Sequence, residues 1–390
     1  MHSSARLRKI TLLVGSTLTV MAGAIISPAL PEISREYAHL PDPELMSKLI
    51  LTLPALVIAL LAPLAGIIID RTGRKRVLLF SLLLYALAGS TGAYLNNIYL
   101  ILTGRVFLGM AVGGLMTAIV TLIGDYYEGD HRSRVMGYQA AFASMGGLVF
   151  ITSGGILADV HWRYPFLIYT ASLVVLVFAW IYIYEPPKAK PARGYPLKGI
   201  KLLKSIPRKV GWVYLISFFS MSVFYMVPVQ MPFMLSNLEG VSNTQVGFAI
   251  AFMNITAITS SFNYSRLKKR MDFSTIQGIV YILIAIGYFI ISQSGTYYMM
   301  IAGILISGLG FGMLWANINL WLISIAPSDI RGTLVGYLNS AIFLGMFLSP
   351  VLLQPLVYFT SLYQSFMLVS FLLLALSAIF LFMKKKKLRG

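Results

Sequence analysis

The chain has 390 residues, of which 58% are hydrophobic and only 11% are charged. A soluble fold of this length needs more polar surface than such a composition supplies, whereas a lipid bilayer accepts an apolar exterior. The composition therefore excludes a soluble globular protein. Because the apolar stretches run for about 20 residues without alternation, they predict membrane-spanning helices and exclude a β-barrel.

The net charge of +18 comes from Lys and Arg residues scattered over short segments between the apolar runs. This placement argues against a nucleic-acid partner and for topology signals beside anionic lipid. The chain contains no cysteine, which excludes disulfides and thiol chemistry. We also expect no cofactor, no metal ion and no enzymatic activity, because the sequence has no nucleophile–base pair, metal-binding cluster or phosphate-binding loop.

Windows of about 19 residues predict twelve membrane spans. We expect them near residues 10–31, 46–69, 77–95, 98–123, 134–157, 165–184, 211–235, 244–264, 274–293, 297–323, 332–355 and 362–383. The first span follows basic residues and has an alternative interpretation as a secretory signal peptide, but its apolar run is long enough to cross a membrane. The predicted fold class is an all-α integral membrane protein.

Lys and Arg gather on one side of these spans. If the N-terminus lies in the cytoplasm, 27 of the 31 Lys and Arg residues are cytoplasmic. Arg35, Lys48 and Arg163 then lie outside, and Arg105 is the only charge clearly inside a span. The positive-inside rule therefore predicts a multi-pass protein of a bacterial-type inner membrane, with both termini cytoplasmic and anionic lipid in the adjacent leaflet.

One long connection, rich in Pro and Lys, separates six spans from six. It predicts a six-helix bundle at 1–184, a cytoplasmic basic linker at 185–209 and a second six-helix bundle at 210–390. Within the linker, Leu197 to Ile206 are predicted to form a short amphipathic helix on the inner leaflet.

The two predicted bundles share a sequence pattern. The segment "EGDHRSRVMGYQAAFASMG" at 128–146 aligns with "PSDIRGTLVGYLNSAIFLG" at 327–345 at an offset of 199 residues. The same offset places Gly104, Gly109 and Gly113 on Gly303, Gly308 and Gly312. A duplicated six-helix unit, with glycines where helices approach closely, predicts two pseudo-symmetric bundles and suits transport by alternating access.

Three motifs carry a family resemblance. The stretch "GIIIDRTGRKRVL" at 66–78 matches the signature G-x-L-a-D-R-x-G-R-K-x-x-L, and "LTGRVFLGMAVGG" at 102–114 and "SPALPEISREY" at 27–37 resemble two further signatures. With these motifs the chain resembles the twelve-helix drug:proton antiporter branch of the major facilitator superfamily. The resemblance covers essentially the whole chain and implies the major facilitator fold.

One expected motif is incomplete. In the span at 134–157, the antiporter branch has a signature that ends G-P-x-x-G-G. Gly154 and Gly155 fit this signature, but Phe150 and Ile151 stand where Gly and Pro are expected. This departure weakens the inference of antiport.

The resemblance implies a conformational gate on the cytoplasmic side. Asp70, Arg74 and Asp125 would form a latch of ion pairs, and Gly73 would permit the sharp turn between two spans. The alternative is an ordinary solvated turn. The gate residues implied by the match are Gly66, Asp70, Arg71, Gly73, Arg74 and Asp125.

Two charged residues are candidates for coupling transport to protons. Arg105 lies inside a span, where charges are functional candidates by default, and the alternative is an arginine that snorkels to water. Its expected partner is a backbone carbonyl, a polar side chain or an acidic group of the substrate. Glu32 is expected near the outer interface, facing the mouth of a cavity, and its alternative is a solvated acid at a helix end.

The substrate cavity is expected between the first, fourth, seventh and tenth spans, which line it in the family. Two prolines in "FYMVPVQMPFML" at 224–235 interrupt regular hydrogen bonding, and the tenth span carries "MLWANINLW" at 313–321. Aromatic and Met-rich walls with a few amides suit a bulky amphipathic compound. The cavity candidates are Tyr225, Met226, Gln230, Asn254, Trp315, Asn317 and Asn319, and the alternative for each is helix packing or lipid contact.

The resulting prediction is a monomeric, proton-coupled exporter of small amphiphilic compounds that works by alternating access. A second hypothesis is a facilitator or symporter of a sugar, a metabolite or a siderophore-like organic acid. A third, from another class, is a membrane sensor that does not transport.

Overall fold

The computed structural model describes residues 2–187, 208–327 and 330–387, without the side chains of residues 2–4, 62–67, 70, 208, 332 and 383–387. In this part of the chain, twelve helices are long and apolar enough to cross a membrane, which confirms the predicted number of spans. The amphipathic helix predicted for Leu197 to Ile206 lies outside the described residues.

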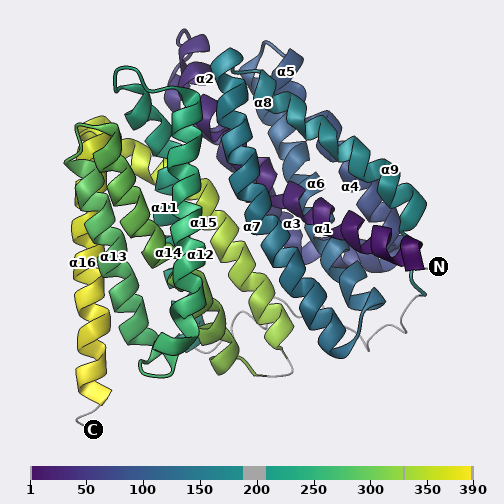
Figure 1. Ribbon diagram of the computed structural model, residues 1–390. Coiled ribbons are helices and arrows are strands. Elements are labelled where there is room, and N and C mark those ends of the chain that lie inside the picture. The colour runs from purple at the N-terminus through teal and green to yellow at the C-terminus, as the bar shows by residue number, and fades with distance from the viewer. Residues whose placement is uncertain (1, 188–207, 328–329, 388–390) are drawn as a thin grey trace.

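The first half of the molecule, up to residue 187, contains six spans (Figure 1). Three of these spans are interrupted: the first by the turn Ser27–Ala29, the third at Ser90, and the sixth by Ile168–Ala171 after its opening turn Tyr164–Leu167. The elements are α1 (His2–Ala24), η1 (Ser27–Ala29), α2 (Leu30–Glu36), α3 (Pro43–Thr72), α4 (Arg74–Gly89), α5 (Thr91–Tyr94), α6 (Ile98–Tyr126), α7 (Gly129–Val160), α8 (Tyr164–Leu167), η2 (Ile168–Ala171) and α9 (Ser172–Tyr182).

The second half, from residue 208, contains six further spans, each a single long helix. Prolines lie inside α11 and α15 without ending either helix. The elements are α11 (Arg208–Ser236), α12 (Asn243–Lys268), α13 (Phe273–Ser292), α14 (Tyr297–Ile325), α15 (Arg331–Phe359) and α16 (Leu362–Lys387).

The internal repeat is visible in the helix boundaries. A shift of 199 residues carries α6 onto α14 at both of its ends, and it carries the end of α7 onto the end of α15. Gly109 and Gly308, related by this shift, both lie where a helix crosses its neighbour so closely that a Cβ would meet backbone atoms within 2.7 Å. Gly113 has open space around it and does not serve such a crossing. The two pseudo-symmetric six-helix bundles are therefore confirmed.

Each half has its own apolar core, and the two halves lie side by side, the first in purple to teal and the second in green to yellow (Figure 1). Residues of α11 also pack into the core of the first half, among them Met221, Tyr225 and Phe233. Ile151 of α7 packs into the core of the second half. Side chains of α7 and α11 therefore cross the boundary between the halves, in addition to the α3–α15 and α7–α12 contacts described below.

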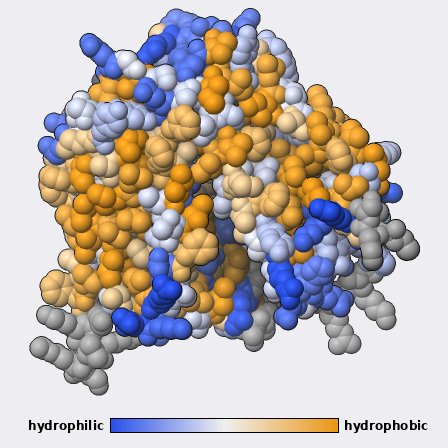
Figure 2. Space-filling view, viewed as in Figure 1, coloured by the Kyte–Doolittle hydropathy of each residue, from blue (hydrophilic) through white to orange (hydrophobic). Residues whose placement is uncertain are grey.

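The two ends of the molecule differ. We call the end that carries the connection between the halves the linker end, and the other end, which carries the turn at 237–242, the opposite end. Figure 2 shows a hollow between the halves that opens at the linker end, at the bottom of the view. At the opposite end the halves are in contact, and the residues that make this contact are described below.

Candidate functional site

At the linker end, the turn between α3 and α4 is held by an acid from the end of the sixth span. Gly73 has a φ of +100°, which favours glycine, and Glu185 accepts hydrogen bonds from the backbone N–H groups of Arg74 (2.7 Å) and Lys75 (2.8 Å). A Cβ on Gly73 would lie 2.9 Å from the Glu185 carboxylate. Glycine is therefore favoured by its backbone conformation, and its missing side chain leaves room for the acid that caps α4.

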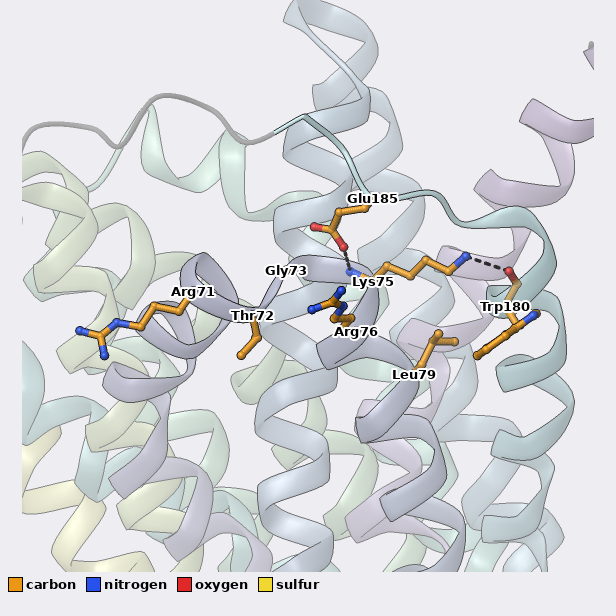
Figure 3. A pocket seen from close by; sticks show the side chains of 8 residues that line it. All are labelled: Arg71, Thr72, Gly73, Lys75, Arg76, Leu79, Trp180 and Glu185. Atoms are coloured by element: carbon orange, nitrogen blue, oxygen red, sulfur yellow. Dashed lines mark hydrogen bonds between the residues drawn. The ribbon is translucent and has the colours of Figure 1, made fainter.

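The same acid lines a cleft of about 460 Å³ whose rim is basic (Figure 3). Lys75 extends along the cleft and donates a hydrogen bond to the carbonyl of Trp180 (2.9 Å), whereas Arg71 points away from Glu185. Glu185 was missed by sequence reasoning. The signal that could have found it is an acid directly after the sixth span, where the basic linker begins.

Of the predicted latch, the structure brings Arg74 and Asp125 together. Arg74 Nε donates to Asp125 Oδ2 at 3.1 Å, and the Arg74 side chain is buried between α4 and α6. Gly66 and Asp70 lie in the last two turns of α3, and the side chain of Asp70 lies outside the described residues. The contact joins two helices of the first half, and its role as a gate remains a prediction.

Arg105 lies inside the core of the first half, with no exposed surface. One of its guanidinium nitrogens donates to the carbonyl of Gly89, and the group lies 4.9 Å from the ring centre of Phe166 and 5.0 Å from that of Tyr169. The alternative of an arginine that snorkels to water is wrong, because these rings enclose the guanidinium. The predicted backbone-carbonyl partner is present. Arg105 Nε and Nη1 have no hydrogen-bond partner among the described residues.

A second buried cation was not expected. The sequence placed Lys48 outside the membrane, but it lies near the start of α3 within a candidate span and has no exposed surface. Its ammonium group contacts Glu44 Oε1 at 2.9 Å and Gln354 Oε1 of α15 at 3.3 Å. It also lies 4.9 Å from the ring centre of Phe233. Among the described residues, Arg105 is therefore not the only fully buried cation, and Lys48 joins the two halves.

Glu32 also lies where the halves meet at the opposite end. It is half-buried on α2, and its Oε1 accepts a hydrogen bond from the side-chain amide of Asn243, the first residue of α12. Glu32 therefore contacts the second half while part of its surface stays exposed, and its role in coupling remains a prediction. Asp159, near the end of α7, accepts hydrogen bonds from the same start of α12. Sequence reasoning missed Asp159, and a single sequence contains no signal for it.

Two tyrosines outside the spans, Tyr37 and Tyr127, have a raised pKa. Burial raises the pKa of Tyr37, although the nearby Arg163 opposes the shift. Burial likewise raises the pKa of Tyr127, against the influence of Arg8. Both phenols therefore stay protonated near neutral pH, and carboxylates remain the better candidates for proton exchange.

Among the cavity candidates, Tyr225 and Trp315 pack where the two halves meet. Trp315 is half-buried, packs against both apolar cores and forms an edge-to-face pair with Phe224 at 5.9 Å. Gln230 is 1% exposed, and neither polar atom of its side chain has a hydrogen-bond partner in the described part of the chain. An unpaired buried amide is costly, and the contact of Gln230 with a ligand remains a prediction.

Two other candidates are placed elsewhere. Met226 has no exposed surface and lies in the core of the second half. Asn317 is also fully buried, where its amide donates to Gln277 (3.0 Å) and to the carbonyl of Phe273 (3.1 Å) and accepts from Tyr264 (3.2 Å). The prediction that these two face a ligand is not supported, because helix packing satisfies them. Asn254 is half-buried and Asn319 is exposed.

Comparison with known proteins shows which family the sequence matches. The family model described as Major Facilitator Superfamily matches residues 12–350. The bacillibactin exporter of Bacillus subtilis (strain 168) is 24% identical over 345 residues, which cover 85% of each chain. The quinolone resistance protein NorA of Staphylococcus aureus (strain Mu50) is 26% identical over 154 residues, which cover 39% of this chain and 38% of NorA.

Among solved structures, a bacterial homologue of the human lysosomal transporter Spinster, in an inward-facing and unoccupied conformation, has a similar fold. It superposes with a TM-score of 0.80 at 17% identity, covering 97% of this chain and 96% of that chain. This likeness concerns the fold alone.

Proposed function

Because this chain belongs to the Major Facilitator Superfamily, whose members are transporters and not enzymes, we propose that it exports a small amphiphilic compound in exchange for protons. The observation that carries the proposal is the hollow at the linker end, combined with halves that touch at the opposite end. A transporter in this state receives its cargo from the linker side. The excess of Lys and Arg in segments of that side supports a cytoplasmic location for it.

The direction of transport is supported by the relatives. One relative that shares most of the chain is a bacillibactin exporter, and a second, matched over part of the chain, confers quinolone resistance by its name. Together with the positive-inside count, they support a bacterial inner-membrane protein with both termini in the cytoplasm and anionic lipid at its basic face. As for most members of the fold, we infer a monomer.

The character of the cargo is inferred from the meeting of the halves. Phe224, Tyr225 and Trp315 provide aromatic surface there, and Gln230, on the same helix as Tyr225, has an unpaired amide. A wall of this kind favours a compound that has a bulky apolar part and a hydrogen-bonding group. Trp315 is the residue expected to contact the apolar part.

Everted membrane vesicles test the proposal, because export then appears as accumulation inside the vesicles. We expect a quinolone or bacillibactin, the two probes suggested by the relatives, to accumulate when the lumen is acidic and to leak out when an ionophore collapses the pH gradient. Trp315→Ala is expected to reduce accumulation several-fold. Leu320→Ala, at an exposed position of the same helix, serves as its matched control.

Two results would contradict the proposal. Accumulation of both probes that ignores the pH gradient would exclude proton exchange, and accumulation of neither would exclude this class of cargo. Asp70→Asn is expected to abolish accumulation in a protein that is still folded, and full activity of this variant would exclude the cytoplasmic latch.

Glu32 remains the carboxylate proposed to exchange protons, and Arg105 remains a second candidate for coupling. Glu32→Gln is expected to flatten the dependence of transport on pH, because the amide does not titrate. Glu36→Gln, one turn further along α2 and exposed, is the control. An unchanged pH profile for Glu32→Gln removes this residue from the coupling mechanism.

A facilitator or symporter of a sugar or organic acid is the second candidate. It is favoured by Phe150 and Ile151, which replace the Gly and Pro of the antiporter signature in α7. Uptake of a sugar into right-side-out vesicles, together with no transport of the quinolone, would support a facilitator or symporter over an exporter.

A further inference from the structure

The start of α12 is completed by the other half of the protein. The first four N–H groups of a helix have no partner within the helix. In α12, a capping box within the second half satisfies two backbone groups, since the N–H of Ser242 donates to Gln245 Oε1 (2.9 Å) and that of Gln245 donates to Ser242 Oγ (3.2 Å). The N–H groups of Asn243 and Thr244 remain for another acceptor.

That acceptor is Asp159 of the first half. Its Oδ1 accepts from the backbone N–H of Asn243 at 2.6 Å, and its Oδ2 accepts from the backbone N–H of Thr244 at 3.1 Å and from the Thr244 hydroxyl. A carboxylate at this position also faces the positive end of the dipole of α12. One side chain therefore makes three hydrogen bonds across the boundary between the halves.

The backbones come close beside this cap. A Cβ on Gly155, one turn before Asp159, would lie 2.4 Å from the carbonyl oxygen of Asn243, and a Cβ on Gly247 would lie 2.8 Å from that of Ile151. The side chain of Asn243 meanwhile donates to Glu32. We call this contact, formed by Gly155 and Asp159 against Asn243, Thr244 and Gly247, the α7–α12 seam.

Every hydrogen bond of the seam requires the opposite end to be closed. If the halves separate there, as alternating access demands, Asp159 and the two N–H groups must exchange their partners for water. We propose that Asp159 is a positioning residue that latches the opposite end, by capping α12 only in the conformation that is open at the linker end. This inference rests on the alternating access of the proposed function, but not on its cargo or its coupling ion.

The absence of cysteine from the sequence allows a direct test. Ser27 is fully buried where η1 meets α11, and its hydroxyl donates to the carbonyl of Pro228 in the second half. Ser27→Cys therefore introduces a single thiol that a hydrophilic maleimide reaches when the opposite end opens. The rate of labelling in purified protein, without any substrate, reports the open population.

In this background, Asp159→Ala is expected to accelerate labelling about tenfold, the loss typical of a helix cap. Asp159→Asn is expected to give a smaller increase, because the amide retains one acceptor but no charge. Asp159→Glu is expected to restore slow labelling, since it keeps the carboxylate, and Glu36→Gln, an acid at the same end, is expected to change nothing.

The results separate the latch from the proposed function. Unchanged labelling in Asp159→Ala overturns the latch, even if transport of every probe proceeds as proposed. Equal acceleration in Glu36→Gln, or no rescue by Asp159→Glu, also overturns it, since a general loosening of the structure then explains the change. Acceleration with rescue supports the latch, even if neither quinolone nor bacillibactin is transported.

Discussion

The halves of this protein meet at the opposite end through two contacts that the internal repeat relates, and the two are built differently. The shift of 199 residues carries Gly155 of α7 onto Gln354 of α15, and Lys48 of α3 onto Gly247 of α12. At the α7–α12 seam these positions are glycines, and the backbones touch. At the other contact, the α3–α15 seam, the same positions hold a lysine and a glutamine whose side chains form a hydrogen bond.

The internal repeat therefore determines which positions of the two halves are in contact, but not the free energy of each contact. A glycine contact allows little adjustment, because helix backbone atoms can move only with their helix, whereas side chains can change rotamer. The Lys48–Gln354 contact depends on two long side chains and on burial of a charge, which loses hydration when the end closes. The α3–α15 seam is therefore where the energy of the closed state can be tuned.

The largest effect is expected from Gly155→Ala at the α7–α12 seam. Its Cβ would overlap backbone atoms of Asn243 and Thr244, so α12 must move outward, at a cost of about 3 kcal/mol to the closed state. We expect faster labelling of a Ser27→Cys reporter and loss of transport.

Gly137→Ala is the matched control, because it lies on the same helix and a Cβ there meets nothing within 4 Å. It is expected to leave labelling unchanged and to raise the thermal stability slightly, since alanine favours a helix. If Gly155→Ala behaved like this control, the close approach of the two helices would not matter for closure.

An effect of opposite sign is expected from Lys48→Met at the α3–α15 seam. Methionine fills a similar volume without a buried charge, while Glu44 and Gln354 are partly exposed and can be hydrated. We therefore expect the closed state to be stabilised by about 2 kcal/mol, with slower labelling of the Ser27→Cys reporter and slower transport.

Gln354→Leu provides the complementary change, since it removes the acceptor and leaves Lys48 buried. It should accelerate labelling where Lys48→Met slows it. The same sign for both variants would show that the seam acts through packing and not through its charge.

The smallest effect is expected at the linker end, where the Arg74–Asp125 pair lies within the first half. Asp125 retains 26% of its side-chain exposure, so a double-mutant cycle of Arg74→Gln and Asp125→Asn in thermal unfolding is expected to give about 1 kcal/mol of coupling or less. Neither variant should accelerate labelling of the Ser27→Cys reporter. Acceleration would mean that the pair communicates with the opposite end.

Part of the candidate site could be predicted from the sequence because its motif is local. Gly73 and Arg74 belong to one continuous stretch, and a turn between two spans places them at a helix start whatever the rest of the fold does. The contact of Arg74 with Asp125 follows from the adjacency of α4 and α6. The partner of Gly73, Glu185, lies 112 residues further along the chain, and no local pattern indicates that the two meet.

Side-chain orientation was harder to predict. Asn317 lies on a span expected to line the cavity, yet its amide finds three partners among α12 and α13. On a membrane helix, polarity alone does not distinguish a residue that faces a cavity from one that joins two helices, because both avoid lipid. The burial of Lys48 was not predicted for a related reason, since its position near a helix end is compatible with either water or a buried contact.

The sequence by itself determined the number of spans, their division into two related halves and the family. The length of the hydrophobic runs, the placement of charges and the spacing of the repeat can all be read along the chain without knowledge of the fold. Only the tertiary structure decided which acids and cations join the halves. Asp159 and Asn243, like Lys48 and Gln354, are far apart in sequence, and their contacts exist only when the two bundles approach at one end. The physical reason is that such contacts depend on the relative position of the bundles, which the local preferences of neither bundle determine.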